Sequence, residues 1–168
     1  MTSSDVPGME IRPATTADAD AIWSILDPIV RAGETYALPR DLPRAEALAW
    51  WHAPGNEVFV AEEGGAVLGT YFIRPNQRGP GSHVANCGYA TAQTATGRGI
   101  ARTMCAHSLE HGRARGYHAM QFNFVISTNV PAVHLWTSMG FETLCRLPGA
   151  FQHPALGFVD ALVMFRTL

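Results

Sequence analysis

The spacing of apolar and polar residues predicts short strands and helices in alternation along the first 82 residues. Apolar side chains recur at helical spacing from Ala19 to Val30, directly after two threonines that can cap a helix. Pro28 lies inside this stripe and should kink the helix or end it early. Gly64-Gly65 separates two apolar runs, which is typical of a β-hairpin turn. The pattern therefore predicts strands over 10–12, 57–62 and 66–73, helices over 19–30 and 44–52, and Gly/Pro loops over 33–43 and 76–82.

The second half predicts a strand, a glycine turn and a helix in succession. A strand over 83–91 precedes glycines at 97 and 99, and a helical stripe then runs from Ile100 to about Arg115. Further strands are predicted over 118–126, 141–147 and 161–167, with a helix over 131–139. The last of these strands is apolar and could pair across a homodimer or lie inside one sheet. These elements predict one α/β domain over 9–168 on a mixed sheet, with residues 1–8 as a flexible tail.

Composition supports one buried core and excludes several chemistries. The chain has 168 residues, of which 47% are hydrophobic and 15% charged, and its formal net charge of −2 gives no reason to expect a nucleic-acid or membrane-surface partner. All 12 basic residues are arginine, and the absence of lysine excludes a Walker-type phosphate loop and Schiff-base catalysis. No segment has the ~18 apolar residues of a membrane span.

The three cysteines, Cys87, Cys105 and Cys145, are too few and too scattered for a disulfide framework or a zinc ribbon. We expect small core residues in a reducing compartment. Because the N-terminus also lacks a secretory signal pattern, a cytoplasmic protein is predicted. Cys87 is disfavoured as a nucleophile, since nothing in the sequence places an activating base beside it.

The segment Thr96-Gly-Arg-Gly-Ile-Ala101 follows a predicted strand and opens a predicted helix. Glycines let the backbone approach a ligand, and a helix N-terminus offers unpaired N–H groups at the positive end of its dipole. Phosphate is the natural occupant, and a tight turn with no ligand is the alternative. A nicotinamide dinucleotide fits poorly, because Arg102 occupies the third glycine position and no acid lies ~20 residues further on.

Two motifs resemble those of the Gcn5-related N-acetyltransferases (GNAT). Thr96 to Ala101 is similar to their Arg/Gln-x-x-Gly-x-Gly/Ala pyrophosphate loop. Asn129-Val-Pro-Ala-Val-His-Leu-Trp136-Thr-Ser-Met-Gly-Phe141 resembles their Asn-x-x-Ala-x-x-Leu-Tyr-x-x-x-Gly-Phe motif, and Ile11 to Asp18 resembles their start. The resemblance covers residues 9–168. It implies an α/β (α+β) fold, with a mixed sheet partly splayed at the middle and flanked by about four helices. It also implies acetyl-CoA as co-substrate and no metal.

A narrower resemblance rests on Asn86-Cys-Gly-Tyr89, on 123–129 and on the segments 147–151 and 157–161. These are similar to the branch that contains the yeast L-azetidine-2-carboxylate N-acetyltransferase, which acetylates proline-like secondary amines. The resemblance implies a small-molecule amine acceptor that carries a carboxylate, and it leaves detoxification of an amino-acid analogue and a biosynthetic role as alternatives. Asn86, Asn123 and Asn129 are implied to face this acceptor, while Asn129 can also cap the following helix.

The resemblance further implies which residues surround the reacting groups. Thr96 replaces the usual Arg or Gln, so backbone N–H groups and the charges of Arg98 and Arg102 are expected to hold the pyrophosphate. A backbone N–H at Ala90 or Thr91 is expected to hold the oxyanion during direct attack by the amine. The expected catalytic residues are Asn86, Ala90 and Thr91. The expected cofactor-binding residues are Ala90, Thr91, Ala92, Thr96, Gly97, Arg98, Gly99, Ile100, Ala101, Arg102, Asn129 and Trp136.

Two departures from the family pattern affect the proton chemistry. Asn86 stands where many relatives place Glu, and an amide can orient an amine or a water but cannot accept a proton. Trp136 replaces a tyrosine that often protonates the departing thiolate, and is either a core anchor or a pantetheine contact. Because only three acids follow residue 82, a water relay or selection of the neutral amine is expected. The same part of the chain, after residue 82, contains six arginines, and this excess of positive charge disfavours a polycationic acceptor.

Two other function classes are compatible with parts of the sequence. His107-Ser-Leu-Glu110-His111 matches His-x-x-Glu-His, whose two histidines share a helix face and could bind Zn²⁺ in a hydrolase. No motif supports a third ligand, for which the candidates are His134, Glu142, His153 and Asp160. A catalytically silent acetyl-CoA-binding module would be consistent with Asn86 and Trp136.

Overall fold

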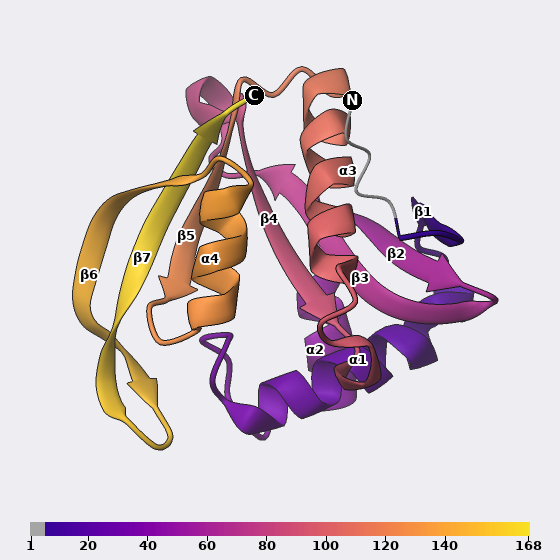
Figure 1. Cartoon of the computed structure of the whole chain (residues 1–168), viewed down its shortest axis with the longest axis horizontal. Helices are drawn as coiled ribbons and strands as arrows, with labels where there is room; N and C mark the ends of the chain where they lie inside the picture. The colour runs from indigo at the N-terminus through magenta and orange to yellow at the C-terminus, as the bar shows by residue number, and fades with distance from the viewer. Residues whose placement is uncertain (1–5) are drawn as a thin grey trace.

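The computed structural model describes residues 6–168, which form one seven-stranded mixed sheet and four α-helices (Figure 1). The sheet order is β1-β2-β3-β4-β5-β7-β6. The strands are β1 (Met9–Pro13), β2 (Glu57–Glu63), β3 (Ala66–Pro75), β4 (Val84–Thr91), β5 (Ala119–Ile126), β6 (Glu142–His153) and β7 (Gly157–Thr167). The helices are α1 (Ala19–Ala32), α2 (Arg44–Trp51), α3 (Ile100–Ala114) and α4 (Val130–Ser138). The predicted fold class and sheet splay are confirmed.

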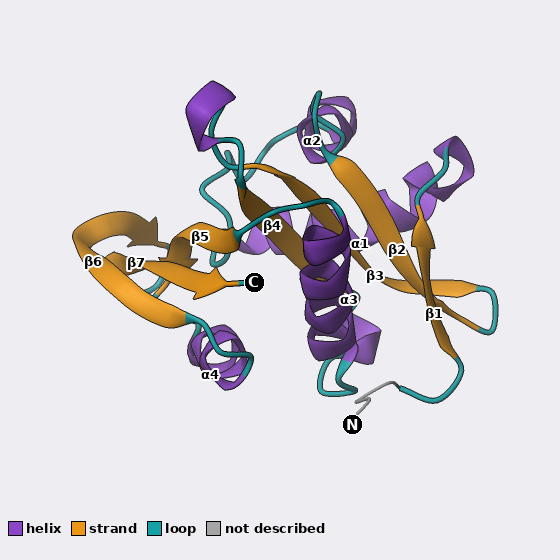
Figure 2. Ribbon diagram, turned by 90° about the horizontal axis from the view of Figure 1, so that it is seen from above, coloured by secondary structure: helices purple, strands orange, loops and turns teal. Residues whose placement is uncertain are grey.

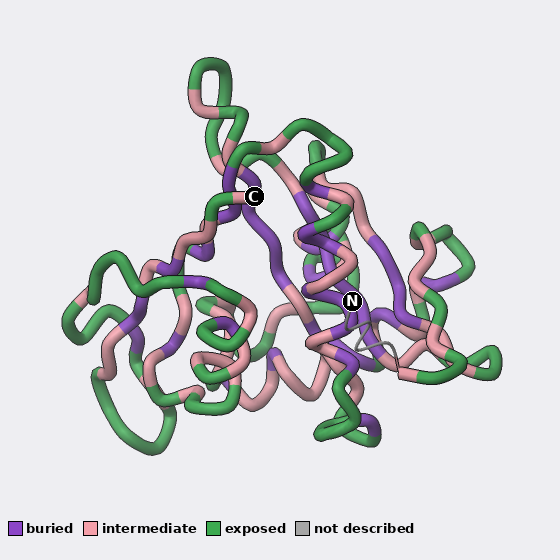
Figure 3. The backbone as a smooth tube through the Cα atoms, turned by 45° about the horizontal axis from the view of Figure 1, so that its top comes forward, coloured by how far each residue is buried: buried purple, intermediate pink, exposed green. Residues whose placement is uncertain are grey.

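Helices cover both faces of the sheet, with α2 on one side and α3 and α4 on the other (Figure 2). One core cluster contains Met104 and Leu109 of α3 and Trp136 of α4, packed on Tyr71 and Cys87 of the sheet. The second cluster joins residues of α1, α2 and the opposite sheet face, among them Ile22, Leu26, Trp51, Val60, Phe72 and Ala90. Figure 3 shows this buried centre and the exposed outer hairpin. Within residues 6–168, no helix is long and apolar enough to cross a membrane.

Most predicted boundaries lie within two residues of the observed ones, and those of α1, β6 and β7 have differences with a physical reason. Helix α1 does not end early at Pro28 but continues to Ala32. Pro28 has no N–H to donate to the carbonyl of Ser24. Because Ser24 is exposed, water can donate to this carbonyl instead. Strands β6 and β7 run several residues beyond the predicted 141–147 and 161–167. A bulge accommodates Gly149, whose N–H donates to Asp160 Oδ1 at 2.9 Å, and the pairing resumes at Phe151.

The C-terminal strand lies inside the sheet. Strand β7 pairs with β5 on one side and with β6 on the other. Of the two arrangements left open by the sequence, pairing within one sheet is the one adopted, and β6 forms the edge. Of the predicted flexible tail 1–8, residues 1–5 lie outside the described residues. Val6 lies beside the start of α3, 3.7 Å from the position that a Cβ on Gly99 would take.

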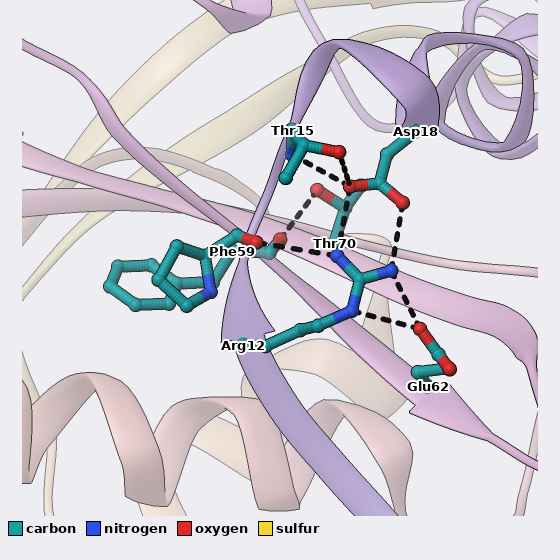
Figure 4. A network of polar contacts seen from close by, with 7 residues as sticks. Arg12, Thr15, Asp18, Phe59, Glu62 and Thr70 are labelled. Carbon is teal, nitrogen blue, oxygen red and sulfur yellow. Dashed lines mark hydrogen bonds and ion pairs between the residues drawn. The ribbon is translucent and has the colours of Figure 1, made fainter.

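The first strand is tied to the fold by a charged network (Figure 4). Arg12 on β1 donates to both carboxylate oxygens of Asp18 at 2.9 Å and to Glu62 Oε2 at 2.6 Å. Asp18 Oδ2 also accepts from the backbone N–H of Thr15 at 2.7 Å. The hydrogen bond from Arg12 holds the pKa of Asp18 well below its ordinary value, although burial acts in the opposite direction.

Replacement Asp18→Asn is expected to lower the urea midpoint at pH 7, with a smaller difference from wild type at pH 3. Because the folded pKa of Asp18 is depressed, its stabilisation is complete above the unfolded pKa of about 3.9 and declines as the pH falls below it. Urea unfolding at pH 7, 5 and 3 measures this. Asp20→Asn is the matched control, since the Asp20 side chain is 86% exposed and its ion pair with Arg44 lies at the surface, where such pairs contribute little. A difference that stayed constant down to pH 3 would contradict the prediction.

Candidate active site

Strands β4 and β5 diverge to form a fork at the centre of the sheet, visible in Figure 1. Their parallel pairing consists of Val84 with Ala119 and Ala85 with Met120, and ends there. Asn86 is the next residue of β4, and its Nδ2 donates to the carbonyl of Gln121 at 3.0 Å. The Asn86 side chain thus replaces the backbone N–H that no longer reaches this carbonyl. This contact gives a structural reason for an amide at position 86, whose side chain is buried.

The register of β4 decides which backbone groups face the open fork. The N–H of Ala92 donates to the carbonyl of Leu68 at 2.8 Å, on the β3 side. Because N–H groups alternate between neighbours along an antiparallel strand, the N–H of Ala90 also faces β3, where Thr70 is its partner residue. The N–H groups of Tyr89 and Thr91 face β5 and hence the fork. Of the two predicted oxyanion donors, the register favours Thr91 over Ala90.

The glycine turn lies where β4 leads into α3. Gly97 and Gly99 both have φ of +81°, a left-handed conformation that side-chain-bearing residues rarely adopt. Gly99 is the N-cap of α3 and provides no side-chain cap. The N–H groups of Ile100, Ala101 and Arg102 belong to the first helical turn, which has no intrahelical acceptors for them. The first turn of α3 therefore presents N–H groups at the positive end of the helix dipole.

The predicted arginines lie beside this turn but already have partners. Arg98 forms an ion pair with Glu63 at 2.6 Å, at the tip of the β2–β3 hairpin. Arg102 donates to Ser138 Oγ at 2.7 Å and so connects α3 with the end of α4. The N–H of Thr96 contacts the carbonyl of Gln93 at 3.4 Å, within the turn itself. The backbone of the turn is thus better placed than its side chains to receive an anion.

Trp136 and Tyr89 form an aromatic wall on the α3 and α4 side of the fork. Their ring centroids are 4.9 Å apart, and Trp136 also contacts Phe122 at 5.0 Å. Trp136 is 9% exposed, which supports its interpretation as a core anchor. Cys87 lies in the same cluster, and burial raises the pKa of its thiol well above the ordinary value. A thiol held protonated in this way is a poor nucleophile.

On the other side of the fork, the loop after α1 approaches the β6–β7 hairpin. Tyr36 of this loop donates its phenolic hydrogen to the carbonyl of Tyr89. A cavity of about 470 Å³ lies between the two segments, with Tyr36, Arg40, Phe151 and His153 among its lining residues. Tyr36 was not among the predicted site residues. The signal available was an aromatic residue in a Gly/Pro loop, which does not reveal a contact across 53 residues.

A second cavity of about 190 Å³ brings together the α1–α2 loop, the β5–α4 connection and the hairpin. Its lining residues are Glu34, Thr35, Thr128, Asn129, Pro131 and His153. Asn129 thus lines a cavity and also caps α4, since its Oδ1 accepts from the N–H of Ala132 at 3.4 Å. Both interpretations of Asn129 are compatible with this placement. Glu34 and His153 were not predicted here, because the sequence does not show which loops meet.

Asn123 lies in a different group of amides. Its Nδ2 donates to Asn76 Oδ1 at 2.7 Å, and its Oδ1 accepts from Gln121 Nε2 at 2.9 Å. Neither cavity includes Asn123 among its lining residues. The structure therefore places Asn129 beside the hairpin and leaves Asn123 in a hydrogen-bonded amide group with Gln121 and Asn76.

The two histidines of the zinc-like motif have other partners. His107 Nδ1 lies 2.7 Å from the Tyr71 hydroxyl, and burial lowers the pKa of His107. His111 Nε2 lies 3.1 Å from Glu57 Oε2. Across residues 6–168, no group of three or more His, Cys, Asp or Glu side chains is arranged to hold a metal ion. The predicted third ligands are thus not brought to this pair.

Comparisons with known proteins show which family has a chain like this one. The sequence model of the Acetyltransferase (GNAT) family matches residues 21–141. N-acetyltransferase aca1 of Schizosaccharomyces pombe is 30% identical over 99 residues, which are 58% of this chain and 47% of that protein. The chain thus spans about half the length of this curated relative.

Two solved structures are similar over nearly the whole chain. A GCN5-related N-acetyltransferase from Kribbella flavida is 39% identical with a TM-score of 0.93, over 98% of this chain and 100% of that one. The protein yncA from Salmonella typhimurium, solved with its cofactor acetyl-CoA, is 25% identical with a TM-score of 0.82, over 96% and 94% of the two chains. Family model, fold and sequence motifs agree, and this chain belongs to the GNAT acetyltransferase family.

Proposed function

We propose that this protein is an N-acetyltransferase that transfers an acetyl group from acetyl-CoA to a small-molecule amine carrying a carboxylate, such as a proline analogue. The observation that carries the proposal is the fork between β4 and β5, with the glycine turn of α3 directly after its open end. Membership of the GNAT family supports the reaction type. The match to a yeast N-acetyltransferase is consistent with the proposed branch.

The residues of the turn fit the diphosphate of acetyl-CoA. A Cβ on Gly97 would meet no described atom within 4 Å beyond its chain neighbours, so the backbone there is open to a ligand. The N–H groups of Gly97, Gly99, Ile100 and Ala101 would hold the diphosphate, while that of Arg98 contacts the carbonyl of Ala95 at 3.4 Å. The side chains of Arg98 and Arg102 would add positive charge beside it. Bound acetyl-CoA supplies the acetyl group as a thioester. The yncA structure, which contains acetyl-CoA, supports this assignment.

The chain's own residues orient the reacting groups at the fork. The N–H of Thr91 faces the gap, where it can donate to a carbonyl oxygen and stabilise developing negative charge. Asn86 holds the two strands at a fixed separation and offers no basic group. We propose that the acceptor reacts as its neutral amine or loses its proton to water. The cavities beside Tyr36 and His153 are the proposed acceptor site.

Thiol release from acetyl-CoA tests this function. Proline analogues, primary amino acids, aminoglycosides and peptides are offered as acceptors, and the products are identified by mass spectrometry. Turnover is expected with small carboxylate-bearing amines and not with aminoglycosides, because the half of the chain after residue 82 has only three acids. Tight acetyl-CoA binding without turnover across the panel would support the silent binding module instead.

Replacement Cys87→Ala is expected to leave turnover unchanged. Burial raises the pKa of this thiol, so it is not available as a thiolate for an acyl-enzyme route. Steady-state kinetics and mass spectrometry of the wild-type protein after reaction measure the outcome. Lost activity in the variant, together with an acetyl adduct on wild-type Cys87, would contradict direct transfer.

We further propose a cytoplasmic, detoxifying role. All three cysteines are free thiols, including exposed Cys145, which suits a reducing compartment. The expected phenotype is resistance of expressing cells to a toxic proline analogue. Equal growth inhibition with and without the protein would contradict this role.

A further inference from the structure

His153 is the residue that lines both cavities beside the fork. It is the last residue of β6, at the start of the tight connection to β7. Its Nδ1 lies 3.1 Å from the backbone nitrogen of Ala155 and 3.2 Å from that of Leu156. One ring nitrogen therefore holds the turn of the hairpin.

These contacts select one tautomer of the neutral imidazole ring. A backbone N–H can only donate, so Nδ1 must be the accepting nitrogen and carry no hydrogen. In a neutral imidazole the hydrogen then resides on Nε2, which becomes a hydrogen-bond donor. His153 lines both cavities, whereas Ala155 and Leu156, whose N–H groups bond Nδ1, line neither. Nε2 is the ring nitrogen that the turn leaves without a partner, and it carries the hydrogen.

The same arrangement excludes His153 as a general base. Nε2 already carries a hydrogen, and Nδ1 could accept a proton only by giving up two hydrogen bonds that hold the turn. A fixed neutral donor in a cavity recognises an acceptor atom of a ligand, above all a carboxylate, because hydrogen bonds to charged groups are the stronger ones.

The surrounding residues complement a zwitterionic amino acid. Asn129 and Thr128 add neutral polar groups to the smaller cavity, and Glu34 supplies its one carboxylate. An acceptor with one carboxylate and one amine matches this set better than a polycation does. We propose that His153 is a specificity-determining residue whose Nε2–H binds the carboxylate of the acceptor. This inference rests on the proposed function and names the determinant of its substrate class.

Two substitutions separate this role from the structural one. In His153→Asn the Oδ1 atom can take the place of Nδ1 and keep the turn, while the donor at the Nε2 position is lost because the shorter amide nitrogen lies nearer the backbone. KM for L-azetidine-2-carboxylate is expected to rise about tenfold, the effect of losing a hydrogen bond to a charged group, with kcat nearly unchanged. KM for its methyl ester is expected to stay the same. In His153→Gln the side-chain amide can supply the donor, so the preference for the acid over the ester is expected to be partly retained.

If the ratio of KM for the acid to KM for the methyl ester were the same in His153→Asn as in the wild type, the proposal would be overturned. NMR of the ring nitrogens at pH 8 provides a readout that needs no turnover. The nitrogen bearing hydrogen is expected to be Nε2, and its signal should shift with L-azetidine-2-carboxylate but not with the methyl ester. A hydrogen on Nδ1, or equal shifts with acid and ester, would overturn the role of His153. Absence of turnover with every acceptor, despite the expected NMR result, would contradict only the proposed transferase function.

Discussion

Replacement Trp51→Ala is expected to lower the free energy of unfolding by about 3–5 kcal/mol, the range for truncating a buried tryptophan. Trp51 is 0% exposed and packs against Phe72, with ring centroids 5.0 Å apart. Its Nε1 donates to Thr70 Oγ1 at 3.0 Å, which in turn donates to the carbonyl of Phe59 at 2.8 Å. Removing the indole leaves a cavity between α2 and the sheet and takes the donor away from a buried hydroxyl.

Such a loss is a large share of the ~5–15 kcal/mol that stabilises an ordinary domain. The urea midpoint and the thermal midpoint measure it. Trp50→Ala is the matched control, because Trp50 is the neighbouring tryptophan on α2 and is only half-buried. It is expected to destabilise the fold by a smaller amount. Equal effects of the two substitutions would show that the buried hydrogen bonds from Trp51 to Thr70 and from Thr70 to Phe59 contribute little to stability.

Replacement Asn86→Ala is expected to lower kcat about 100-fold, because a displacement of about 1 Å in reacting groups can have that effect. The Nδ2 of Asn86 joins β4 to Gln121 where the strands separate. Alanine would leave the Gln121 carbonyl without this donor and allow the fork to change its width. The dissociation constant for acetyl-CoA is expected to stay within a few fold, since the glycine turn is untouched.

Asn86→Asp distinguishes a positioning role from an acid–base role. A carboxylate cannot donate to the Gln121 carbonyl, so the aspartate variant is expected to be as slow as the alanine variant. If the residue acted on the proton of the acceptor, aspartate would instead retain or increase turnover. Thr143→Ala, an exposed position on β6, is the control for substitution as such. Unchanged turnover in Asn86→Ala would remove Asn86 from the site.

Local patterns predicted most elements of this fold. The Gly64-Gly65 turn joins β2 to β3 with φ of +58° and +83°, as two adjacent glycines between apolar runs require. Gly97 and Gly99 lie at the start of α3, also as predicted. These features depend on conformational preferences of a few neighbouring residues, so sequence alone determined them.

The exact ends of β6 and β7 could not be predicted in the same way. Pro148 and Gly149 favour a loop locally, but Arg146 and the N–H of Gly149 both bond Asp160 on the facing strand. Pairing with β7 therefore continues the strand past residues that would otherwise end it. The tertiary partner overrides the local preference.

The site shows the same division. Sequence by itself determined the family, the glycine turn, the capping asparagine and the absence of lysine, because each is a property of a short segment or of the composition. Tertiary structure decided that Thr91 rather than Ala90 faces the fork, that Asn86 bonds Gln121, and that His153 meets Asn129 beside the α1–α2 loop. Each of these depends on strand register or on contacts between distant segments, and neither is fixed until the sheet has paired.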